Sequence, residues 1–451
     1  MNIVIAGAGK VGYHLAKTLS IYHDITIIDK NPEAISKIQD DLDVMAINGN
    51  IEDPTTYFKC DKKIDYFIAV TNSDEVNIIS TLIIDDILKV DKKIIRLKNK
   101  FFLKSSISKK LNIHKSIFSV YNVAHTFSKL LEFPYANNIK EFNSLDKIML
   151  SVRVYNPDYI GYNIREISKE FNDEVVIVGL ERDKKFYIPN YSEVVKRGDL
   201  LYIFGVKEVI KSKYMELENP ELVNTKRNTN CILFGANRLG IEIAKVLLEH
   251  KFEVKIIERD LQKCEIASEI LQGRATILNS RYGWGHLLKE EGLDSADMLI
   301  ASSENDEYNI VKCIEGKKSG IGKVIAINND REYYSLMHSL NLVVIRGEKI
   351  DTYYSILENI NTDSFITQKR YCGGRGVVLC KKISNGSKCL NKKINIPQKI
   401  ADIAQIYIIQ NRTQKIVRDL EDITYQTDDT LILFAKSQYS DFLENWIYQE
   451  V

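Results

Sequence analysis

The stretch IVIAGAGKVG, residues 3–12, decides the fold of this chain. Its first four residues are apolar and predict a buried strand, and the residues that follow Gly12 predict a helix. The pattern Gly-x-Gly-x-x-Gly lies between them and favours a dinucleotide-binding turn in this strand-turn-helix context. We expect the turn to hold phosphate at the amino end of the helix, through Gly7, Ala8, Gly9, Lys10, Val11 and Gly12.

Each glycine has a separate physical task in such a turn. Gly7 would permit the tight turn, Gly9 would let a pyrophosphate approach the backbone, and Gly12 would let the helix pack closely on the strand. A second apolar run at 25–28 ends in Asp29, where a dinucleotide fold places the carboxylate that binds a ribose hydroxyl. That carboxylate would repel a 2′-phosphate, so NAD(H) or adenosine is favoured over NADP.

The rest of the first 120 residues continues the alternation of strands and helices. Apolar runs at 44–47, 65–70, 94–97 and 117–120 predict four more strands with helices between them. Six such strands predict a parallel, doubly wound sheet. Polar residues 71–75 follow the fourth strand, at the sheet edge where open α/β folds bind their ligands.

The plan then restarts, which indicates a duplication. A second glycine turn follows Gly7 by 228 residues, and a second strand-end acid, Glu258, follows Asp29 by 229. The pattern Asp-Glu-x-Asn at 74–77 occurs again 232 residues later. A similar turn sequence occurs 230 residues after the one at 198–201. These coherent offsets predict two tandem copies of a two-domain unit.

The predicted fold class is α/β, with two Rossmann-like doubly wound parallel sheets, each followed by a small α+β lobe. Strand patterns dominate each small lobe, and a polar stretch joins the two copies. The expected segments are a nucleotide-binding domain at 1–134, a small lobe at 140–218, a linker at 219–230, a second nucleotide-binding domain at 231–361 and a second small lobe at 370–451.

The two copies differ at positions that matter for ligand chemistry. In the second turn a side chain, Asn237, stands where backbone should approach phosphate. In the second copy, Asn279 corresponds to Gly49 and Ala326 corresponds to Arg96. We expect the first site to bind dinucleotide, and the second to bind weakly, to bind another nucleotide or to serve as scaffold. The candidate residues of the second site are Gly235, Ala236, Asn237, Arg238, Leu239 and Glu258.

Composition narrows the class of protein. Of the 451 residues, 45% are hydrophobic and 27% are charged, which is typical of a soluble globular chain. The net charge of +1 creates no global attraction to nucleic acid. No apolar run approaches the ~18 residues of a membrane span, and the amino-terminal stretch is a core strand rather than a signal peptide. We therefore expect a cytoplasmic protein.

The seven cysteines and seven histidines are scattered, without a CxxC or a metal-ligand spacing. The sequence therefore predicts free thiols, no metal site and no catalytic residue. His286 and His338 each stand alone, and a lone histidine is more often a surface residue or one with its hydrogen bonds satisfied.

One dense basic stretch, 92–115, contains Phe101 and Phe102 and has the composition of a nucleic-acid-binding patch. A solvated face with one ligand arginine, Arg96, explains it more simply. Contact with acidic lipid or with a membrane partner is the other alternative. We expect no nucleic-acid partner.

The order of these motifs resembles the RCK (regulator of potassium conductance) family, also called KTN, over nearly the whole chain. The resemblance rests on the opening turn with Val11, on the strand end at 27–29, and most specifically on the run AVTNSDEVN at 69–77. The duplicated layout is also typical of that family. The pair Ser302-Ser303 departs from the Thr-Asn or similar pair that its members usually carry.

The resemblance implies NAD(H) and ATP or ADP as ligands. We assign NAD(H) to the first half, with ATP or ADP as an alternative in either half. By the same resemblance the first turn would hold phosphate and Asp29 would hold ribose. The rest of the nucleotide would then contact Asn50, Thr71, Asn72 and Arg96.

The resemblance also implies a function. It is that of a nucleotide-sensing regulatory subunit, peripheral on the cytoplasmic face of the inner membrane. Such subunits assemble as a homo-oligomeric ring against an integral-membrane potassium transporter subunit of the TrkH or TrkG type and control its gate.

The alternative function is that of an NAD-dependent oxidoreductase with a duplicated Rossmann fold. Such an enzyme needs an acid or base held near the nicotinamide by a substrate domain. Here the module after the first fold is strand-rich, and no histidine occurs between 126 and 249. We therefore expect a regulator and not an enzyme.

Overall fold

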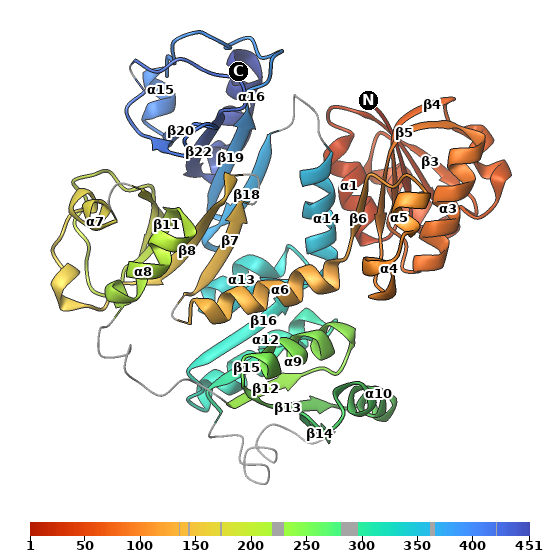
Figure 1. Cartoon of the computed structure of the whole chain (residues 1–451), viewed down its shortest axis with the longest axis horizontal. Coiled ribbons are helices and arrows are strands. Elements are labelled where there is room, and N and C mark those ends of the chain that lie inside the picture. Colours follow the sequence, from red (N-terminus) through yellow and green to blue (C-terminus); the bar gives the residue numbers. More distant parts are fainter. Residues whose placement is uncertain are drawn as a thin grey trace. The chain divides into compact units, whose positions relative to one another are not determined.

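The computed structural model spans the 451 residues and describes all of them except 135, 143–144, 172–173, 219–229, 281–295, 361–365 and 421. A parallel sheet is followed by an antiparallel sheet, and this pair of sheets occurs twice along the chain (Figure 1). The α/β fold predicted from the sequence, with two Rossmann-like sheets and two small lobes, is confirmed. The linker predicted at 219–230 lies outside the described residues, apart from Asn230.

The first parallel sheet has the strand order β3-β2-β1-β4-β5-β6, which is that of a doubly wound dinucleotide fold. Its central strand contains Ile3, Val4 and Ile5, which are fully buried, as expected for parallel strands covered on both faces. The strands are β1 (Asn2–Ala6), β2 (Asp24–Asp29), β3 (Met45–Asn48), β4 (Lys63–Ala69), β5 (Lys89–Arg96) and β6 (Lys115–Ile117). The helices are α1 (Lys10–Leu19), α2 (Pro32–Asp41), η1 (Pro54–Lys59), α3 (Asp74–Ile87), α4 (Phe101–Lys104), α5 (Ile107–Lys110) and α6 (Ser119–Glu132).

The first small lobe is an antiparallel sheet with the order β10-β9-β11-β8-β7. Its helix α7 (Ile164–Glu170) begins at a capping box, in which Asn163 and Glu166 each accept a hydrogen bond from the other's backbone N–H. The strands are β7 (Asn138–Phe142), β8 (Lys147–Arg153), β9 (Val175–Arg182), β10 (Lys185–Tyr187) and β11 (Leu200–Gly205). The helices are η3 (Pro157–Tyr159), α7 (Ile164–Glu170) and α8 (Lys207–Glu218).

The second half repeats both sheets, with orders β14-β13-β12-β15-β16-β17 and β18-β19-β22-β20-β21. The strands are β12 (Asn230–Phe234), β13 (Glu253–Glu258), β14 (Thr276–Asn279), β15 (Met298–Ala301), β16 (Lys323–Asn328), β17 (Val343–Arg346), β18 (Thr367–Tyr371), β19 (Gly376–Lys382), β20 (Ala404–Ile409), β21 (Ile416–Val417) and β22 (Thr430–Lys436). The helices are α9 (Arg238–Glu249), α10 (Leu261–Leu271), α12 (Asp306–Lys318), α13 (Tyr333–Ser339), α14 (Glu348–Asn359), η6 (Cys372–Gly374), α15 (Gln398–Ala401), η7 (Ser437–Tyr439) and α16 (Ser440–Glu450).

The repeat extends to single turns of the small lobes. Gly198 has φ +86° and donates its N–H to Val154, and Asp428 has φ +69° and donates its N–H to Ile383. These residues precede β11 and β22 respectively, so the offset of 230 read from the sequence aligns equivalent turns. The duplication is therefore present in the structure and is not a chance similarity of sequence.

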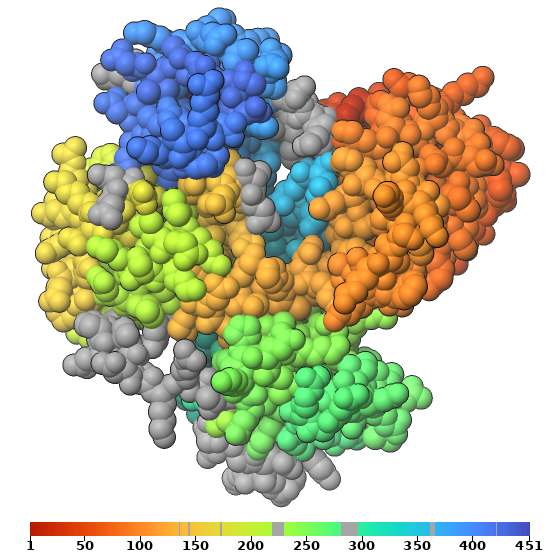
Figure 2. Space-filling view, viewed as in Figure 1, coloured from red at the N-terminus to blue at the C-terminus, as the bar shows by residue number. Residues whose placement is uncertain are grey.

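The two small lobes share one apolar core. Phe204 on β11 and Phe434 on β22 lie with their ring centroids 5.2 Å apart, and Tyr202 lies at the same distance from Tyr371. All four side chains are buried in one cluster. Figure 2 shows the blue surface of the second small lobe against the yellow surface of the first. The two sheets therefore bury each other's inner faces.

Two expectations for individual strands were wrong. The sixth strand was expected at 117–120 but ends at Ile117, and residues 119–120 begin α6. The apolar run crosses from strand to helix, and a short apolar run alone does not distinguish the two. Strand β7 was not predicted, because its sequence NIKEF is half polar, as an edge strand that pairs only with β8 allows.

By its contacts the chain divides into two compact units. Unit 1 comprises 1–125, 328–331 and 346–360, and unit 2 comprises 126–327, 332–345 and 361–451. Helix α14 follows the last strand of the second parallel sheet in sequence, yet it belongs to unit 1 and packs on α1. None of the helices in the described part of the chain is long and apolar enough to cross a membrane.

Candidate nucleotide site

Most of the residues expected around the first nucleotide come from four neighbouring strand ends. Strands β2, β1, β4 and β5 are adjacent and parallel, and end at Asp29, Ala6, Ala69 and Arg96. The glycine turn follows β1, and Thr71 and Asn72 follow β4. The fold therefore brings these segments to one edge of the first parallel sheet.

Gly7 and Gly12 are glycines for reasons of packing. Gly7 has φ +111°, and a Cβ there would meet the backbone N of Thr71 at 3.2 Å. A Cβ at Gly12 would overlap the carbonyl oxygen of Gly7. Both positions therefore exclude side chains with or without a ligand.

Gly9 differs from the other two glycines, because it faces open space. A Cβ at Gly9 would meet no heavy atom within 4 Å, and its φ of −66° suits any residue. Gly9 is the N-cap residue of α1, and no side chain caps this helix. The amino end of α1 is therefore open to an anion, which backbone N–H groups and the helix dipole would attract.

Asp29 holds the turn from the end of β2. Its carboxylate accepts hydrogen bonds from the backbone N–H of Ala8 at 2.6 Å and from that of Asn31 at 2.9 Å. The side chain is half-buried at the sheet edge. This places one carboxylate beside the glycine turn, as binding of a ribose hydroxyl would require.

The segment after β4 is fixed by a side chain that the site prediction omitted, Asn77. Its Oδ1 accepts hydrogen bonds from the backbone N–H and the hydroxyl of Thr71, at 3.0 and 2.7 Å. Its Nδ2 donates to the carbonyl oxygen of Arg96 at 2.9 Å. Asn77 is fully buried and thereby joins the ends of β4 and β5. Its place in the 69–77 run was the signal that could have identified this role.

Arg96 is a buried cation at the end of β5, only 4% exposed. Its guanidinium lies 3.4 Å from Asn72 Oδ1 and 3.4 Å from Glu348 Oε2 on α14, and its Nε has no hydrogen-bond partner. Burial lowers the pKa of Arg96, and the charge of Glu348 opposes that shift. Because its two contacts are long and its Nε is unpaired, this guanidinium is able to donate hydrogen bonds to an anionic ligand.

The remaining predicted residues of the first site have different surroundings. Lys10 is exposed and lies 2.9 Å from Asp330. Asn50 is exposed, and its Oδ1 accepts the N–H of Glu52 at 3.1 Å. Ala8 and Val11 are buried, so only their backbone is available to a ligand.

In the second site, Asn237 fills the space that is open at Gly9. Its Oδ1 accepts the N–H of Gly240 at 2.8 Å, and its Nδ2 donates to the carbonyl oxygen of Ser302 at 2.7 Å. The side chain thus caps α9 and bridges the turn to the end of β15. One helix N–H that could contact a phosphate already has a partner in the protein.

Other parts of the second site preserve the first arrangement. Glu258 accepts the N–H of Ala236 at 2.9 Å, as Asp29 does from Ala8. Ser303 donates its N–H and hydroxyl to Asn309, at 2.9 and 2.8 Å, as Thr71 does to Asn77. Ala236 and Leu239 are buried, Arg238 is exposed, and Gly235 has φ +105°.

The hydrogen bonds correct the alignment of the two halves. Asn309 donates to the carbonyl oxygen of Ile327, so Ile327 and not Ala326 is the counterpart of Arg96. The N–H of Ser280 bonds to Glu258 as that of Gly49 bonds to Asp29, so Gly49 is answered by Ser280 and not by Asn279. Insertions between elements shift the spacing between corresponding positions of the two halves by one residue. The sequence alone did not show this shift.

The basic stretch 92–115 does not form a single solvated face. Lys93 is 2% exposed and lies 2.6 Å from Asp85, and Arg96 is buried at the candidate site. Lys92 donates to the hydroxyl of Tyr66 at 3.1 Å. Several of its cations therefore have partners within unit 1.

Comparison with known proteins agrees with this geometry. The model of the TrkA-N domain matches residues 3–117 and 231–345, together just over half of the chain. The two matches coincide with the two parallel sheets, so the molecule is built on a duplicated dinucleotide-type domain. The chain belongs to the TrkA-N domain family.

Relatives are similar over nearly their whole length. The chain is 28% identical to the Trk system potassium uptake protein TrkA homolog of Archaeoglobus fulgidus, covering 97% of both chains. It is 25% identical to TrkA homolog 1 of Methanosarcina mazei, covering 99% of this chain and 100% of the relative. Among solved structures, the "GsuK channel bound to NAD" matches with a TM-score of 0.60 and 14% identity, covering 100% of this chain and 79% of that one, which establishes likeness of fold alone.

Proposed function

We propose that this chain is a nucleotide-sensing regulatory subunit of a potassium uptake system. Its relatives from Archaeoglobus fulgidus and Methanosarcina mazei bear that system's name and match almost end to end. In this proposal the protein is peripheral on the cytoplasmic face of the membrane and forms a homo-oligomeric ring. Its partner is an integral-membrane potassium transporter subunit of the TrkH or TrkG type, whose gate it controls, and nucleic acid is not a partner.

The open turn at Gly9, set against the filled turn at Asn237, carries the proposal for the ligand. NAD(H) would bind in the first half, with phosphates at the amino end of α1, ribose on Asp29 and an anionic group on Arg96. A channel of the same fold is described as bound to NAD. ATP or ADP is the alternative ligand, because it shares the adenosine, ribose and phosphate that these residues would contact.

Arg96 also suggests how binding would be transmitted. Its guanidinium contacts Glu348, which lies on α14, a helix supplied by the second half of the chain. An anion that reaches Arg96 would compete with Glu348 and change the free energy of docking α14 in unit 1. A ligand shifts a conformational equilibrium only through such a difference in affinity between two states.

A reciprocal exchange of residues tests the ligand proposal in the full chain. Gly9→Asn should weaken NADH binding at least about tenfold, because the new side chain would occupy the phosphate position and cap the helix. Asn237→Gly is the matched control and should leave one NADH per chain, because Ile327 stands where the first site has Arg96. Isothermal titration measures affinity and stoichiometry. Loss of binding in Asn237→Gly but not in Gly9→Asn would reverse the assignment.

The oxidoreductase alternative is tested by turnover. A regulator should bind NADH without oxidising it, so the absorbance of NADH should stay constant with candidate small substrates. Steady oxidation with one defined substrate would favour the enzyme, which needs an acid or base near the nicotinamide.

A further inference from the structure

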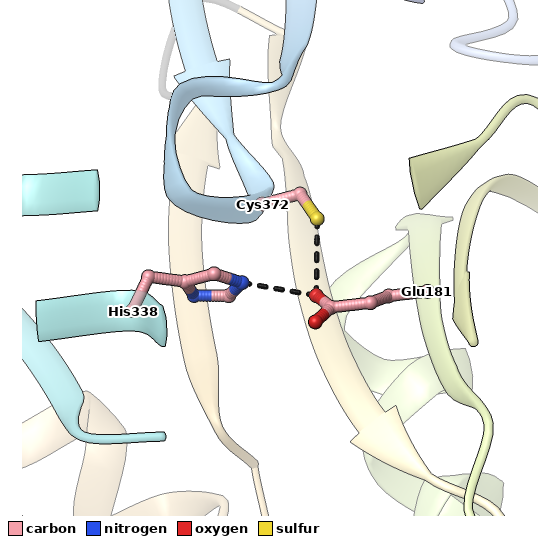
Figure 3. Close-up of side chains that lie close together, drawn as sticks. All are labelled: Glu181, His338 and Cys372. Carbon is pink, nitrogen blue, oxygen red and sulfur yellow. Dashed lines mark hydrogen bonds and ion pairs between the residues drawn. The ribbon is translucent and has the colours of Figure 1, made fainter. Parts of the chain in front are cut away.

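Three side chains from separate segments of unit 2 meet at one point, well away from the glycine turns in sequence. They are Glu181 on β9, His338 on α13 and Cys372, the first residue of η6 (Figure 3). Their potential ligand atoms all lie within 4.8 Å of one another. Glu181 Oε2 lies 2.9 Å from His338 Nε2 and 3.1 Å from Cys372 Sγ. We propose that these three residues form a site for a transition-metal dication of the Zn²⁺ class.

The donor set and its spacing match Zn²⁺. Zinc takes thiolate, imidazole and carboxylate ligands in tetrahedral geometry, with bonds of about 2.3 Å to sulfur and about 2.0–2.1 Å to nitrogen or oxygen. Those bonds separate neighbouring donors by about 3.3–3.6 Å in a tetrahedron. The observed separations of 2.9 and 3.1 Å thus need to widen by only a few tenths of an ångström.

The backbone around Cys372 is arranged for close approach to His338. Cys372 has φ +52° and Gly373 has φ +63°, so two successive residues adopt the left-handed conformation. A non-glycine residue in that region is uncommon and is retained where the surrounding structure requires it. A Cβ at Gly373 would lie 2.7 Å from His338 Cδ2. The tip of the β18–β19 hairpin is therefore held directly against the imidazole.

The cluster already contains a cation, Arg375, which a bound metal would have to displace. Arg375 Nη2 lies 3.1 Å from Glu181 and 3.3 Å from Cys372 Sγ. A bound dication would therefore compete with this guanidinium for Glu181 and Cys372.

Binding of Zn²⁺ would proceed by exchange of protons for metal. The thiol of Cys372 would release its proton to solvent, and the thiolate would bind the metal. His338 would bind through Nε2 in the neutral tautomer that carries its proton on Nδ1. All three residues line one cavity of about 1360 Å³ within unit 2, which would admit the ion and supply water as a fourth ligand.

Such a metal would join three parts of unit 2. Glu181 belongs to the first small lobe, Cys372 to the second, and α13 to the second nucleotide-binding domain. The contact would therefore fix the packing of both small lobes against that domain. The sequence did not reveal the site, because 157 and 191 residues separate Glu181 from its two partners.

The test is Zn²⁺ binding by the full chain, measured by chelator competition, with Co²⁺ as a spectroscopic probe. We expect one tightly bound Zn²⁺ per chain and, with Co²⁺, the intense thiolate-to-metal band of a sulfur-ligated site. Cys372→Ser and His338→Gln should each weaken Zn²⁺ binding at least about 100-fold and remove the rise in melting temperature that Zn²⁺ causes in the parent chain.

Cys60→Ser and His125→Asn are matched controls that remove a cysteine and a histidine of unit 1, and they should bind Zn²⁺ as the parent does. Glu181→Gln keeps the shape of the side chain and replaces Cys372→Ser if that variant fails to fold. Unchanged Zn²⁺ affinity in folded Cys372→Ser or Glu181→Gln, or absence of the thiolate band, would overturn the proposal.

Discussion

At the residue scale, most glycines of the turn are required by the packing of the fold and not by a ligand. Gly12 and its counterpart Gly240 are both required, because a Cβ at either would overlap the carbonyl oxygen of Gly7 or Gly235. They persist in the second half, where Asn237 stands in place of Gly9. The motif therefore predicted the turn in both halves, and its middle position is one of the places at which the two sites differ.

Gly12→Ala tests this distinction between packing and ligand binding. Because the added methyl group has no space, the free energy of unfolding should fall by about 2 kcal/mol or more. Gly9→Ser should change it by less than about 1 kcal/mol, since its φ of −66° is ordinary and serine caps helices well. Urea unfolding without nucleotide measures both variants. Equal destabilisation by Gly12→Ala and Gly9→Ser would show that a side chain at position 9 meets neighbouring atoms.

At the scale of elements, helix α14 links the second half of the chain to the first candidate site. Nothing in its sequence predicted that this helix would pack on α1. Tyr353 contacts Thr18, Glu348 contacts Arg96, and Asp351 accepts a hydrogen bond from Asn122 at 3.0 Å. Local periodicity determines that a helix forms, whereas the partner of its apolar face depends on the path of the whole chain.

The packing of α14 should be sensitive to pH through Asp351. Burial raises its pKa to about 6, and the hydrogen bond from Asn122 opposes that shift. An acid whose pKa is raised by folding destabilises the folded state when ionised, so the penalty grows above its unfolded pKa and is complete above about pH 6. Asp351→Asn should therefore stabilise the protein by about 1–2 kcal/mol near pH 8 and by much less near pH 4.5.

Chemical denaturation at the two pH values measures the effect of Asp351→Asn. Asn preserves the oxygen that accepts from Asn122, so the comparison isolates the charge. A gain in stability that is the same at both pH values would mean that ionisation of Asp351 does not destabilise the folded protein.

At the scale of the whole molecule, the two halves are sequence repeats but not independent units. Unit 1 contains 346–360 from the second half, and unit 2 contains the first small lobe from the first half. The buried residues of α14 include Ile350, Tyr353 and Ile356. Separating the halves would expose the surfaces that these contacts cover, so a ligand-binding assay on isolated halves would not report on the native sites.

Expression of residues 1–229 alone tests the exchange of α14. The fragment lacks that helix, so it should expose an apolar face and elute as dimers or larger species. Light scattering after size exclusion measures this. The control is the full chain cleaved within 219–229 after folding, which should keep both pieces together. A monomeric 1–229 with cooperative unfolding would contradict the expected dependence on α14.

The sequence by itself determined the duplication, the two Rossmann-like sheets and the asymmetry between Gly9 and Asn237. These follow from local patterns, because strand periods, glycine turns and capping residues act over a few neighbouring positions. Only the tertiary structure decided that α14 joins unit 1, that Asn77 holds Thr71, and that Glu181, His338 and Cys372 meet. Those contacts join residues far apart along the chain, and their geometry depends on how whole elements pack.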